Sequence, residues 1–404
     1  MRFWGVTGTN GKTTTTWITA EFINADPARK CGYVTTVEVN TGARQFYTGY
    51  TTPPLNQLKE IFAEMEANGC TDCVMEVSSH AIHQHRTGDT VFSGGVFTNL
   101  SEDHLDYHKT MEAYFDVKLD FARQIAAAHP TTPDMGRRDL PPYVVCLDGG
   151  YGKEMFNAVG NLAVNVIPVS IKKVKPEVEV EQRNLNHHCS TSTPDFDLSE
   201  LQLVGDYNKS NVLCAAALAE AAGVPHDAIQ AVIPTLKPRW GRLEEVKVKG
   251  EGEGGGPRVF VDFAHTPDGL EKVLATARGF TPEGKKLWIV FGAGGDRDPM
   301  KRPLMGEACA KLADRLVVTS DNPRSEDPLK IIDAIKEGIV HCSPSPSVFT
   351  YIEPDRKKAI EFALREAAEG DVVIIAGKGH ETTQEIRGVK HPFDDREVVR
   401  SFRG

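Results

Sequence analysis

The stretch GVTGTNGKTTTT, residues 5–16, constrains the fold more than any other part of the chain. A short apolar run, a glycine-rich turn, and a lysine followed by threonines predict a strand, a loop and the start of a helix. In such a loop, the backbone N–H groups and the positive end of the helix surround a phosphate. The stretch therefore predicts a phosphate site in an α/β domain.

The predicted loop departs from the general phosphate-loop pattern at one position. That pattern has a glycine five residues before Gly11, where this chain has Val6. A tight turn with an incidental lysine is the alternative interpretation. We favour phosphate binding, in which Lys12 reaches the terminal phosphates and Thr13 binds Mg²⁺. The residues expected to bind the nucleotide here are Gly8, Thr9, Asn10, Gly11, Lys12, Thr13 and Thr14.

Apolar runs alternate with amphipathic stretches along the remaining chain. This alternation predicts βαβ units, in which mostly parallel sheets are covered by helices on both faces. Residues 178–200 are expected to form an antiparallel extension. Helices are expected at residues 55–69, 111–129 and 208–223. Strands are expected at residues 2–8, 71–77, 93–100, 143–150, 258–265, 286–295, 314–322 and 371–380.

The strand pattern restarts near residue 240, which predicts two domains. Residues 1–239 are expected to form a nucleotide-binding domain of the P-loop type with a mostly parallel sheet. Residues 240–404 are expected to form a Rossmann-like α/β domain. The segment 249–257, KGEGEGGGP, is expected to be a surface hairpin. Neither this segment nor the insertion at 131–142 has an assigned function.

The composition excludes several classes of protein. The 404 residues carry a formal net charge of −10, so the chain lacks a general coat of lysine and arginine for nucleic acid. No run of about 18 apolar residues could span a bilayer, and the N-terminus lacks the pattern of a secretory signal. We therefore expect a cytoplasmic protein that binds neither nucleic acid nor a membrane.

Polar residues follow two predicted strands, where open α/β sheets place their sites. Glu76 ends the apolar run CVMEV, and His104 follows the run VFTNLSEDH. A carboxylate at the end of a buried strand is costly without a partner, so Glu76 is expected to bind metal. The stretch VSSHAIHQHR resembles a serine-histidine hydrolase superficially, but it lacks the G-x-S-x-G turn of that class.

Nine stretches of the chain occur in a characteristic order. They are GVTGTNGKTTT, MEVSSHAIHQHR, FTNLSEDHLDYH, GDYNKSN, GRLEEV, VDFAHTPD, FGAGGDRDPMKRP, SDNPR and AGKGHE. As a set they resemble the Mur ligases of peptidoglycan synthesis, and the similarity extends over nearly all 404 residues. Within that family, the chain is most similar to the ligases that add meso-diaminopimelate. The resemblance makes residues 1–239 the central ATP-binding domain and residues 240–404 the amino-acid-binding domain.

The resemblance implies an ATP-dependent ligase with Mg²⁺ as cofactor. ATP would phosphorylate the D-glutamate γ-carboxylate of UDP-N-acetylmuramoyl-L-alanyl-D-glutamate, and the amine of meso-diaminopimelate would then displace phosphate. Positioning and charge neutralisation dominate such chemistry. The implied catalytic residues are Lys12, Glu76, His104 and Lys118, and the implied metal-binding residues are Thr13, Glu76, His104 and Lys118.

Lys118 has two interpretations. Within AYFDVKLDF it is typical of a solvated helix lysine. The resemblance instead places it at the carbamoylated lysine of the family, whose carbamate helps to orient the second metal. Because CO₂ reacts only with the neutral amine, such a site must lower the lysine pKa or trap the product between cations.

The resemblance also implies residues for the nucleotide and for the acceptor. Asn208 and Asn211 would lie on the adenine side, although capping of the following helix is an alternative role for Asn208. Arg242 and Asp262 would approach phosphate and ribose. The residues implied for the muramoyl dipeptide are Thr51, Thr52, Ser78, Gln84 and Arg86.

The stretch SDNPR indicates the incoming amino acid. meso-Diaminopimelate has one carboxylate more than lysine, and a guanidinium binds such a group through two parallel hydrogen bonds. Arg324 is expected to make this contact, although Asn-Pro by itself also favours a β-turn. Glu381 is expected to hold a substrate ammonium. The other implied contacts are Arg297, Asp321, Asn322, Pro323 and Gly377.

Two other functions remain open from the sequence. A folylpolyglutamate-synthase-like ligase shares the fold and the acyl-phosphate chemistry, but its amine is glutamate. A non-catalytic scaffold derived from a Mur ligase would keep only ATP binding. Phosphate release that depends on both acceptor and amine distinguishes the ligase from the scaffold.

The start of the chain raises a question about the acceptor. Family members carry about a hundred residues ahead of the first strand, which form a separate domain that grips UDP. Four residues precede Gly5 in this sequence. We expect weak binding of UDP-muramoyl-dipeptide, and either a separate uridine-binding polypeptide or a shortened sequence explains the difference. The expected partners are otherwise small-molecule substrates, and the expected state is a monomer.

Overall fold

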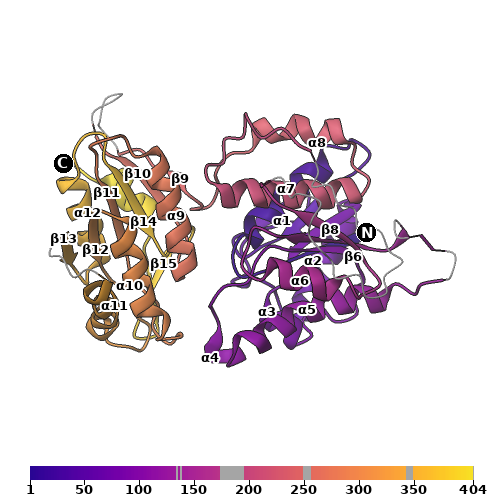
Figure 1. Cartoon of the computed structure of the whole chain (residues 1–404), viewed down its shortest axis with the longest axis horizontal. Coiled ribbons are helices and arrows are strands. Elements are labelled where there is room, and N and C mark those ends of the chain that lie inside the picture. Colours follow the sequence, from indigo (N-terminus) through magenta and orange to yellow (C-terminus); the bar gives the residue numbers. More distant parts are fainter. Residues whose placement is uncertain (133–134, 137–138, 173–194, 249–255, 343–348, 404) are drawn as a thin grey trace. The chain divides into compact units, whose positions relative to one another are not determined.

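The computed structural model describes the chain in two units. The described residues are 1–132, 135–136, 139–172, 195–248, 256–342 and 349–403. Unit 1 comprises Met1–Ser101 and His108–Leu236, and unit 2 comprises Glu102–Tyr107 and Lys237–Gly404. Each unit has its own sheet and its own helices (Figure 1). We describe each unit by itself.

Unit 1 is built on an eight-stranded sheet with the order β4-β3-β2-β5-β1-β6-β7-β8. The strands β2, β5, β1, β6, β7 and β8 run parallel, whereas β3 and β4 are antiparallel additions at one edge. The strand before the phosphate loop, β1, is therefore central. The bounds are β1 (Arg2–Thr7), β2 (Cys31–Val34), β3 (Val39–Asn40), β4 (Gln45–Phe46), β5 (Asp72–Glu76), β6 (Phe92–Phe97), β7 (Pro142–Cys146) and β8 (Asn165–Val169).

Helices cover both faces of the unit 1 sheet. Figure 1 shows α1 and α7 on one side and α2, α5 and α6 on the other, where a large apolar core lies. Both faces are covered because the parallel strands are apolar on both sides. The bounds are α1 (Lys12–Asn24), α2 (Leu55–Ala67), α3 (Ser79–His83), α5 (Met111–Ala128), α6 (Gly152–Val159), α7 (Asp206–Ala221), α8 (His226–Val232) and the 3₁₀ helix Ile233–Thr235. The short helix α4 (Leu105–His108) belongs mostly to the segment grouped with unit 2.

Unit 2 has a six-stranded sheet with the order β13-β12-β11-β14-β10-β9, in which only β9 is antiparallel. The helices α9, α10 and α11 pack on one face, and α12 and α13 pack on the other. The strands are β9 (Glu244–Glu245), β10 (Arg258–Asp262), β11 (Leu287–Phe291), β12 (Arg315–Val318), β13 (Phe349–Ile352) and β14 (Val372–Ala376), with a separate hairpin of β15 (Thr383–Ile386) and β16 (Val389–Pro392). The helices are α9 (Pro267–Phe280), α10 (Lys301–Leu312), α11 (Pro328–Cys342), α12 (Arg356–Glu366) and α13 (Asp395–Ser401).

The predicted fold class is confirmed, since both units are α/β with mostly parallel sheets. The helix predicted at 208–223 begins at Asp206 and ends at Ala221, just before Gly223 at φ +94°. The sequence did not reveal the two-residue strands β3 and β4 or the β15–β16 hairpin, because such short runs carry too little periodicity. The predicted extension at 178–200 and hairpin at 249–257 lie largely outside the described residues. The boundary at residue 240 stays a prediction.

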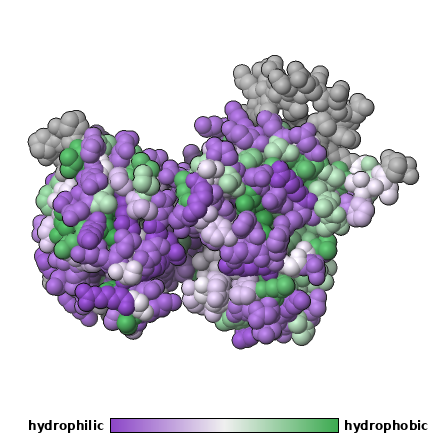
Figure 2. Space-filling model, turned by 90° about the horizontal axis from the view of Figure 1, so that it is seen from below, coloured by the Kyte–Doolittle hydropathy of each residue, from purple (hydrophilic) through white to green (hydrophobic). Residues whose placement is uncertain are grey.

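The molecular surface is mainly hydrophilic on the face that Figure 2 shows, and no long apolar helix occurs among the described residues. Hydrophilic residues predominate on the face shown in Figure 2, and hydrophobic residues occur there in small groups. Among the described residues, no helix combines the length and the apolar character that a membrane crossing needs.

Helices α10 and α11 of unit 2 approach each other through two glycines. A Cβ atom on Gly338 would lie 1.8 Å from the carbonyl oxygen of Pro303, and one on Gly306 would lie 2.1 Å from that of Ile335. Both distances are far below van der Waals contact, and the obstructing atoms are backbone. The close crossing of these helices therefore depends on the two glycines.

We expect Gly338→Ala to destabilise the fold because the added methyl group must push α10 and α11 apart. Overpacking of this kind costs about 1–3 kcal/mol, which urea unfolding followed by far-UV circular dichroism would measure. Gly279→Ala on α9 is the matched control, since a Cβ there meets nothing within 4 Å. The control should be neutral or stabilise by up to about 1 kcal/mol. Equal unfolding midpoints for the two variants would contradict the prediction.

Candidate active site

The phosphate loop joins β1 to α1 in unit 1 and requires two of its glycines. Gly11 precedes the first residue of α1 with φ +85°, a conformation that favours glycine. A Cβ on Gly8 would lie 1.9 Å from Thr98 Oγ1, and one on Gly11 would lie 2.4 Å from Asn211 Oδ1. The loop therefore packs directly on the end of β6 and on α7.

Asn99, at the end of β6, holds the loop and was not predicted from the sequence. Its Oδ1 accepts a hydrogen bond from Asn10 N at 3.0 Å, and its Nδ2 donates to Asn10 O at 3.0 Å. Thr98 Oγ1 donates to the same carbonyl at 2.6 Å, and Thr9 N donates to Asn99 O at 2.9 Å. These bonds fix the backbone that would face a phosphate. The polar run TNLSEDH after an apolar strand was the available sequence signal.

Lys12 lies over its own loop. Its Nζ donates to the carbonyl oxygens of Gly8 and Thr9, both at 2.9 Å. The neighbouring Thr13 is buried and Thr14 is half-buried, at the first turn of α1. A cation beside a helix N-terminus is an arrangement that attracts an anion.

The two asparagines predicted for the nucleotide lie on α7. Asn211 Oδ1 accepts a hydrogen bond from Thr15 Oγ1 at 3.3 Å, which ties α7 to α1. Asn208 Nδ2 donates to Val204 O at 2.8 Å. The N-cap of α7 is Gly205, and it makes no side-chain capping bond. The alternative role of Asn208 as the helix cap is therefore wrong.

Glu76 ends β5 and is 1% exposed. Its carboxylate accepts hydrogen bonds from Thr36 N at 2.8 Å and Thr36 Oγ1 at 3.1 Å. Among the described residues no cation pairs with this buried carboxylate, a situation that suits a metal ion. No group of three or more His, Cys, Asp and Glu side chains with metal-binding geometry occurs in the described part of the chain. The predicted set contains only two such residues, so this finding does not test it.

Lys118 lies on the buried face of α5 and is 1% exposed, so its interpretation as a solvated helix lysine is wrong. Its Nζ donates to Gly8 O at 2.9 Å and lies 4.7 Å from the centre of the Tyr114 ring. Tyr114, a residue that the sequence did not single out, also contacts Thr9 Oγ1 through its hydroxyl at 3.1 Å. His108 also stacks on the Tyr114 ring, with centroids 4.9 Å apart. Helix α5 therefore supports the phosphate loop.

The residues predicted for the acceptor come together beside Glu76. Thr52 Oγ1 donates to the main-chain oxygen of Glu76 at 2.8 Å and accepts from Ser78 N at 3.1 Å. Arg86 reaches Gln84 Oε1 at 2.8 Å and Thr52 O at 3.3 Å. The remaining member, Thr51, accepts from Thr36 Oγ1 at 3.0 Å. All five predicted residues thus belong to one connected group.

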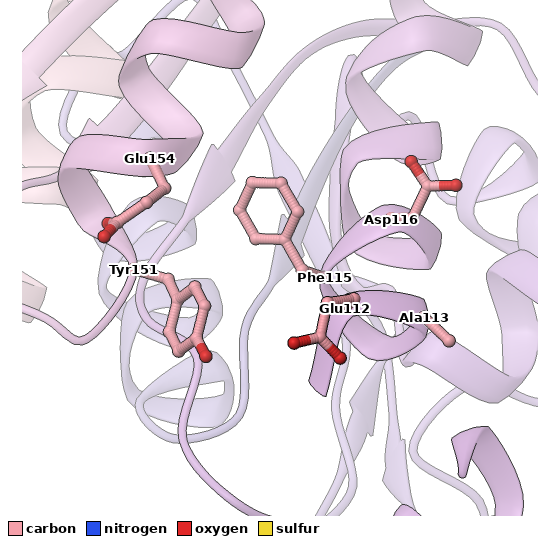
Figure 3. Close-up of a pocket in the computed structure, with 6 residues that line it drawn as sticks. All are labelled: Glu112, Ala113, Phe115, Asp116, Tyr151 and Glu154. Atoms are coloured by element: carbon pink, nitrogen blue, oxygen red, sulfur yellow. The ribbon is translucent and has the colours of Figure 1, made fainter. Parts of the chain in front are cut away.

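A surface pocket lies between α5 and α6, apart from these residues. Its volume is about 510 Å³, and Figure 3 shows two aromatic rings and three carboxylates around it. None of the predicted site residues contributes to its wall. The lining residues are Glu112, Ala113, Phe115, Asp116, Tyr151 and Glu154.

His104 belongs to the short segment grouped with unit 2. Its Nε2 lies 3.5 Å from Asp103 Oδ2, and Lys301 Nζ lies 3.7 Å from Asp103 Oδ1. Burial opposes the charged form of Asp103, but His104, Lys301 and His265 together hold its pKa below the usual range. Because Glu76 belongs to unit 1, a metal site shared by Glu76 and His104 stays a prediction.

Asp262 and Arg242, which the resemblance places near phosphate and ribose, interact electrostatically in unit 2. Asp262 is 8% exposed, and burial raises the pKa of its carboxyl group. Its two oxygens accept hydrogen bonds from Leu243 N at 2.6 Å and Ala264 N at 2.7 Å. The Arg242 guanidinium lies 4.6 Å from the centre of the Phe263 ring. Asp262 therefore also has a structural role, since it holds the GRLEE turn to β10.

The residues predicted for the amino acid lie beyond the ends of β12 and β14, except Arg297, which follows β11. Asn322 Nδ2 donates to Glu381 Oε2 at 2.8 Å, which joins the two segments. Asp321 is 7% exposed, and its Oδ1 makes no hydrogen bond to any described residue. A Cβ on Gly377 would lie 3.6 Å from this carboxylate. The orphaned oxygen is a suitable acceptor for an ammonium group.

Arg324 and Arg297 differ in how firmly they are held. Arg324 has φ +51°, and its Nη1 donates to Gly295 O at 2.5 Å. A non-glycine residue in this conformation is strained, and such strain is common at functional sites. Pro323, which lies between Asn322 and Arg324 in the sequence, is buried, whereas Arg297 is exposed. The structure thus gathers the DNPR segment and leaves Arg297 at the surface.

Two family models match the chain. The Mur ligase middle domain matches residues 6–219, and the glutamate ligase domain of Mur ligases matches residues 241–379. Curated relatives include a UDP-N-acetylmuramoyl-L-alanyl-D-glutamate–2,6-diaminopimelate ligase of Neisseria meningitidis serogroup B, 37% identical over 99% of this chain and 77% of its own length. A ligase of the same name from Geobacillus thermodenitrificans is 40% identical over 98% of this chain and 78% of its own length.

Solved structures support the same assignment. A 2,6-diaminopimelate ligase of that name is 32% identical with a TM-score of 0.59, covering 99% of this chain and 78% of the other. Folylpolyglutamate synthase of Mycobacterium tuberculosis, solved with ADP and AMPPCP, has a TM-score of 0.61 at 18% identity, covering 93% and 88%. At this low identity, the similarity to folylpolyglutamate synthase shows only that the fold is shared. Because the family models match both units and the relatives match almost the whole chain, the chain belongs to the Mur ligase family.

Proposed function

We propose that the chain is an ATP-dependent ligase that joins meso-diaminopimelate to the D-glutamate γ-carboxylate of UDP-N-acetylmuramoyl-L-alanyl-D-glutamate. The observation that carries the proposal is the match over 98–99% of the chain with ligases that bear this name. The geometry agrees with it, since unit 1 offers a phosphate loop and unit 2 offers groups for an amino acid. The proposed place of action is the cytoplasm, and the proposed state is a monomer.

The proposed reaction has two steps. A γ-carboxylate oxygen of glutamate attacks the γ-phosphorus of ATP, the bond to ADP breaks, and an acyl phosphate forms. The amine nitrogen of the amino acid then attacks the acyl carbon, and phosphate leaves from the tetrahedral intermediate with its bridging oxygen. The amine proton passes to solvent or to a base, and an amide bond remains. Such chemistry depends mainly on positioning and charge neutralisation.

Unit 1 would hold the phosphates and the acceptor. Backbone N–H groups of residues 8–14 and Lys12 would bind the terminal phosphates of ATP, and Asn208 and Asn211 would lie on the adenine side. A magnesium ion would neutralise charge on the transferring phosphoryl group. Glu76 and Thr13 fit such an ion, because the Glu76 carboxylate is buried beside neutral partners. The connected group around Thr52 would hold the muramoyl dipeptide, with Arg86 facing a carboxylate.

Unit 2 would hold the amino acid. The Arg324 guanidinium would bind the distal carboxylate of diaminopimelate, and Asp321 Oδ1 and Glu381 would accept hydrogen bonds from its ammonium groups. Arg297 would contribute from the surface, and Asn322, Pro323 and Gly377 would shape the site. Arg242 and Asp262 would approach the phosphate and ribose of the nucleotide, and His104 would contribute to metal binding.

Lys118 would carry a carbamate. Burial disfavours the charged ammonium, and only the neutral amine reacts with CO₂. The amine nitrogen attacks the carbon of CO₂ and loses one proton, which leaves an anionic carbamate. That anion would lie beside the phosphate loop, where it could help to orient a metal ion.

The amino-acid preference tests the proposed function. We expect meso-diaminopimelate to be ligated with a kcat/KM at least about 10⁴-fold above that of L-lysine, because lysine leaves the site cation without its carboxylate. Phosphate release with a panel of amino acids, including L-glutamate, would measure this ratio. Arg324→Ala should reduce the ratio strongly. Comparable kcat/KM values for lysine, or a preference for glutamate, would contradict the assignment.

The carbamate on Lys118 has its own test. We expect Lys118→Ala to lower kcat by about 10³-fold or more, as loss of a group that stabilises the transition state does. Added short carboxylic acids should restore part of the activity because they replace the lost anion. Lys59→Ala, which removes an exposed lysine on α2, is the matched control. Full activity of the Lys118 variant, or a ¹³CO₂-labelled wild-type protein without a carbamate signal in NMR, would refute the proposal.

A further inference from the structure

Arg356, the first residue of α12, is a cation buried inside unit 2. Its side chain and that of Asp395 on α13 are both 0% exposed. The pair is bidentate, with Nε to Oδ1 at 2.8 Å and Nη2 to Oδ2 at 2.7 Å. Such a fork fixes the orientation of the guanidinium as well as its charge.

The other donors of Arg356 reach two separate strand ends. Nη2 donates to the carbonyl of Ala376, the last residue of β14, at 2.9 Å, and Nη1 donates to the carbonyl of Ser320, just after β12, at 3.3 Å. In the sheet, β11 lies between these strands. One side chain therefore links the loops that follow two strands which are not adjacent in the sheet. The next residues along the chain are Asp321 and Gly377, which are proposed to contact the amino acid.

Lys378 is a second buried cation at the same edge of the sheet. Its side chain is 0% exposed, and its Nζ donates to Glu381 Oε2 at 2.8 Å and to Asn322 Oδ1 at 3.1 Å. It also lies 3.8 Å from Asp321 Oδ1. The amine thus faces three residues of the proposed amino-acid site without being part of it. The sequence did not single out this lysine, because the motif AGKGHE does not reveal where its side chain points.

The charges around the two cations do not balance. Asp395 pairs with Arg356, and Glu381 pairs with Lys378. Asp321 acts on both cations from a longer distance and keeps an oxygen without a hydrogen bond. Within this group of five side chains, three carboxylates and two cations give one formal negative charge, which the ammonium group of an amino acid would balance.

We propose that Arg356 and Lys378 are positioning residues for the amino-acid site of unit 2, an inference that rests on the proposed function. Arg356 fixes the main chain of both loops, and Lys378 fixes the side chains that face the substrate. Removal of either cation leaves buried acceptors without donors, so the loops shift. Loss of one hydrogen bond to a charged ligand weakens binding about 10-fold or more.

Asp371 provides a matched control at the opposite end of β14. It is 4% exposed, and its carboxylate accepts from Trp288 Nε1 at 3.0 Å, Lys286 N at 2.9 Å and Ala368 N at 3.1 Å. Asp371→Asn therefore disturbs a buried carboxylate of the same sheet far along the strand from Ala376. It should lower the melting temperature and leave the KM values unchanged.

The test compares Arg356→Lys and Lys378→Gln with Asp371→Asn in steady-state kinetics of the full chain. We expect both variants to raise the KM for the amino acid about 10-fold or more, with the KM values for ATP and acceptor within about twofold of the wild type. Thermal unfolding of each variant checks that it is folded. Arg356→Lys keeps the positive charge but cannot form the bidentate pair with Asp395. A higher KM in this variant would therefore come from lost positioning and not from lost charge.

The outcomes separate the two proposals. The KM is measured for whichever amino acid the wild type ligates, so ligation of an amino acid other than diaminopimelate contradicts the proposed function and still tests the positioning role. An unchanged amino-acid KM, or KM values that rise together for all substrates, overturns the inference. A KM increase equal to that of Asp371→Asn overturns it as well. Asp395→Asn, which keeps the shape of the side chain, replaces Arg356→Lys if the latter does not fold.

Discussion

The carbonyl oxygen of Gly8 accepts hydrogen bonds from two lysines, Lys12 Nζ and Lys118 Nζ, each at 2.9 Å. Two ammonium groups around one neutral oxygen repel each other, and the effect is strong because Lys118 is buried. Nucleotide phosphates and a carbamate, the anions of the proposed function, would reduce this repulsion. Asn99 and Tyr114 fix the loop from β6 and α5, so the two lysines can converge without displacing it.

The two units concentrate opposite charges at equivalent places. In each sheet the proposed site lies beyond the carboxyl ends of parallel strands, where loops can vary without disturbing the core. Unit 1 gathers cations and backbone N–H groups there, which suits phosphates. Unit 2 leaves Asp321 Oδ1 without a hydrogen bond beside two buried cations, which suits an ammonium group. Unit 1 therefore offers cations to the proposed phosphates, and unit 2 offers a carboxylate oxygen to the proposed ammonium group.

The sequence predicted the fold class and most long elements because periodic apolar runs are local features. It could not predict that Lys118 is buried, because an isolated helix does not show which face packs on a sheet. Asn99 and Lys378 were missed for a related reason, since their partners are distant along the chain. The capping role considered for Asn208 was wrong because α7 begins at Asp206 with Gly205 as its N-cap, which places Asn208 inside the first turn of the helix. Tertiary packing, rather than local propensity, decided each of these cases.

The fold alone does not select the amino acid, since folylpolyglutamate synthase shares it at 18% identity. Selection has to come from the loops, and Arg324 is the residue proposed to provide it. Its left-handed backbone costs about 1–3 kcal/mol, and main-chain bonds to Glu385 O at 3.0 Å and from Arg387 N at 2.6 Å hold it in place. A Cβ on Gly294 would lie 2.9 Å from Arg324 Nη1, so this glycine leaves room for the guanidinium. The strained backbone of Arg324, the β15–β16 hairpin that holds it and the space left by Gly294 together position one guanidinium. A guanidinium in this place suits a substrate with a second carboxylate.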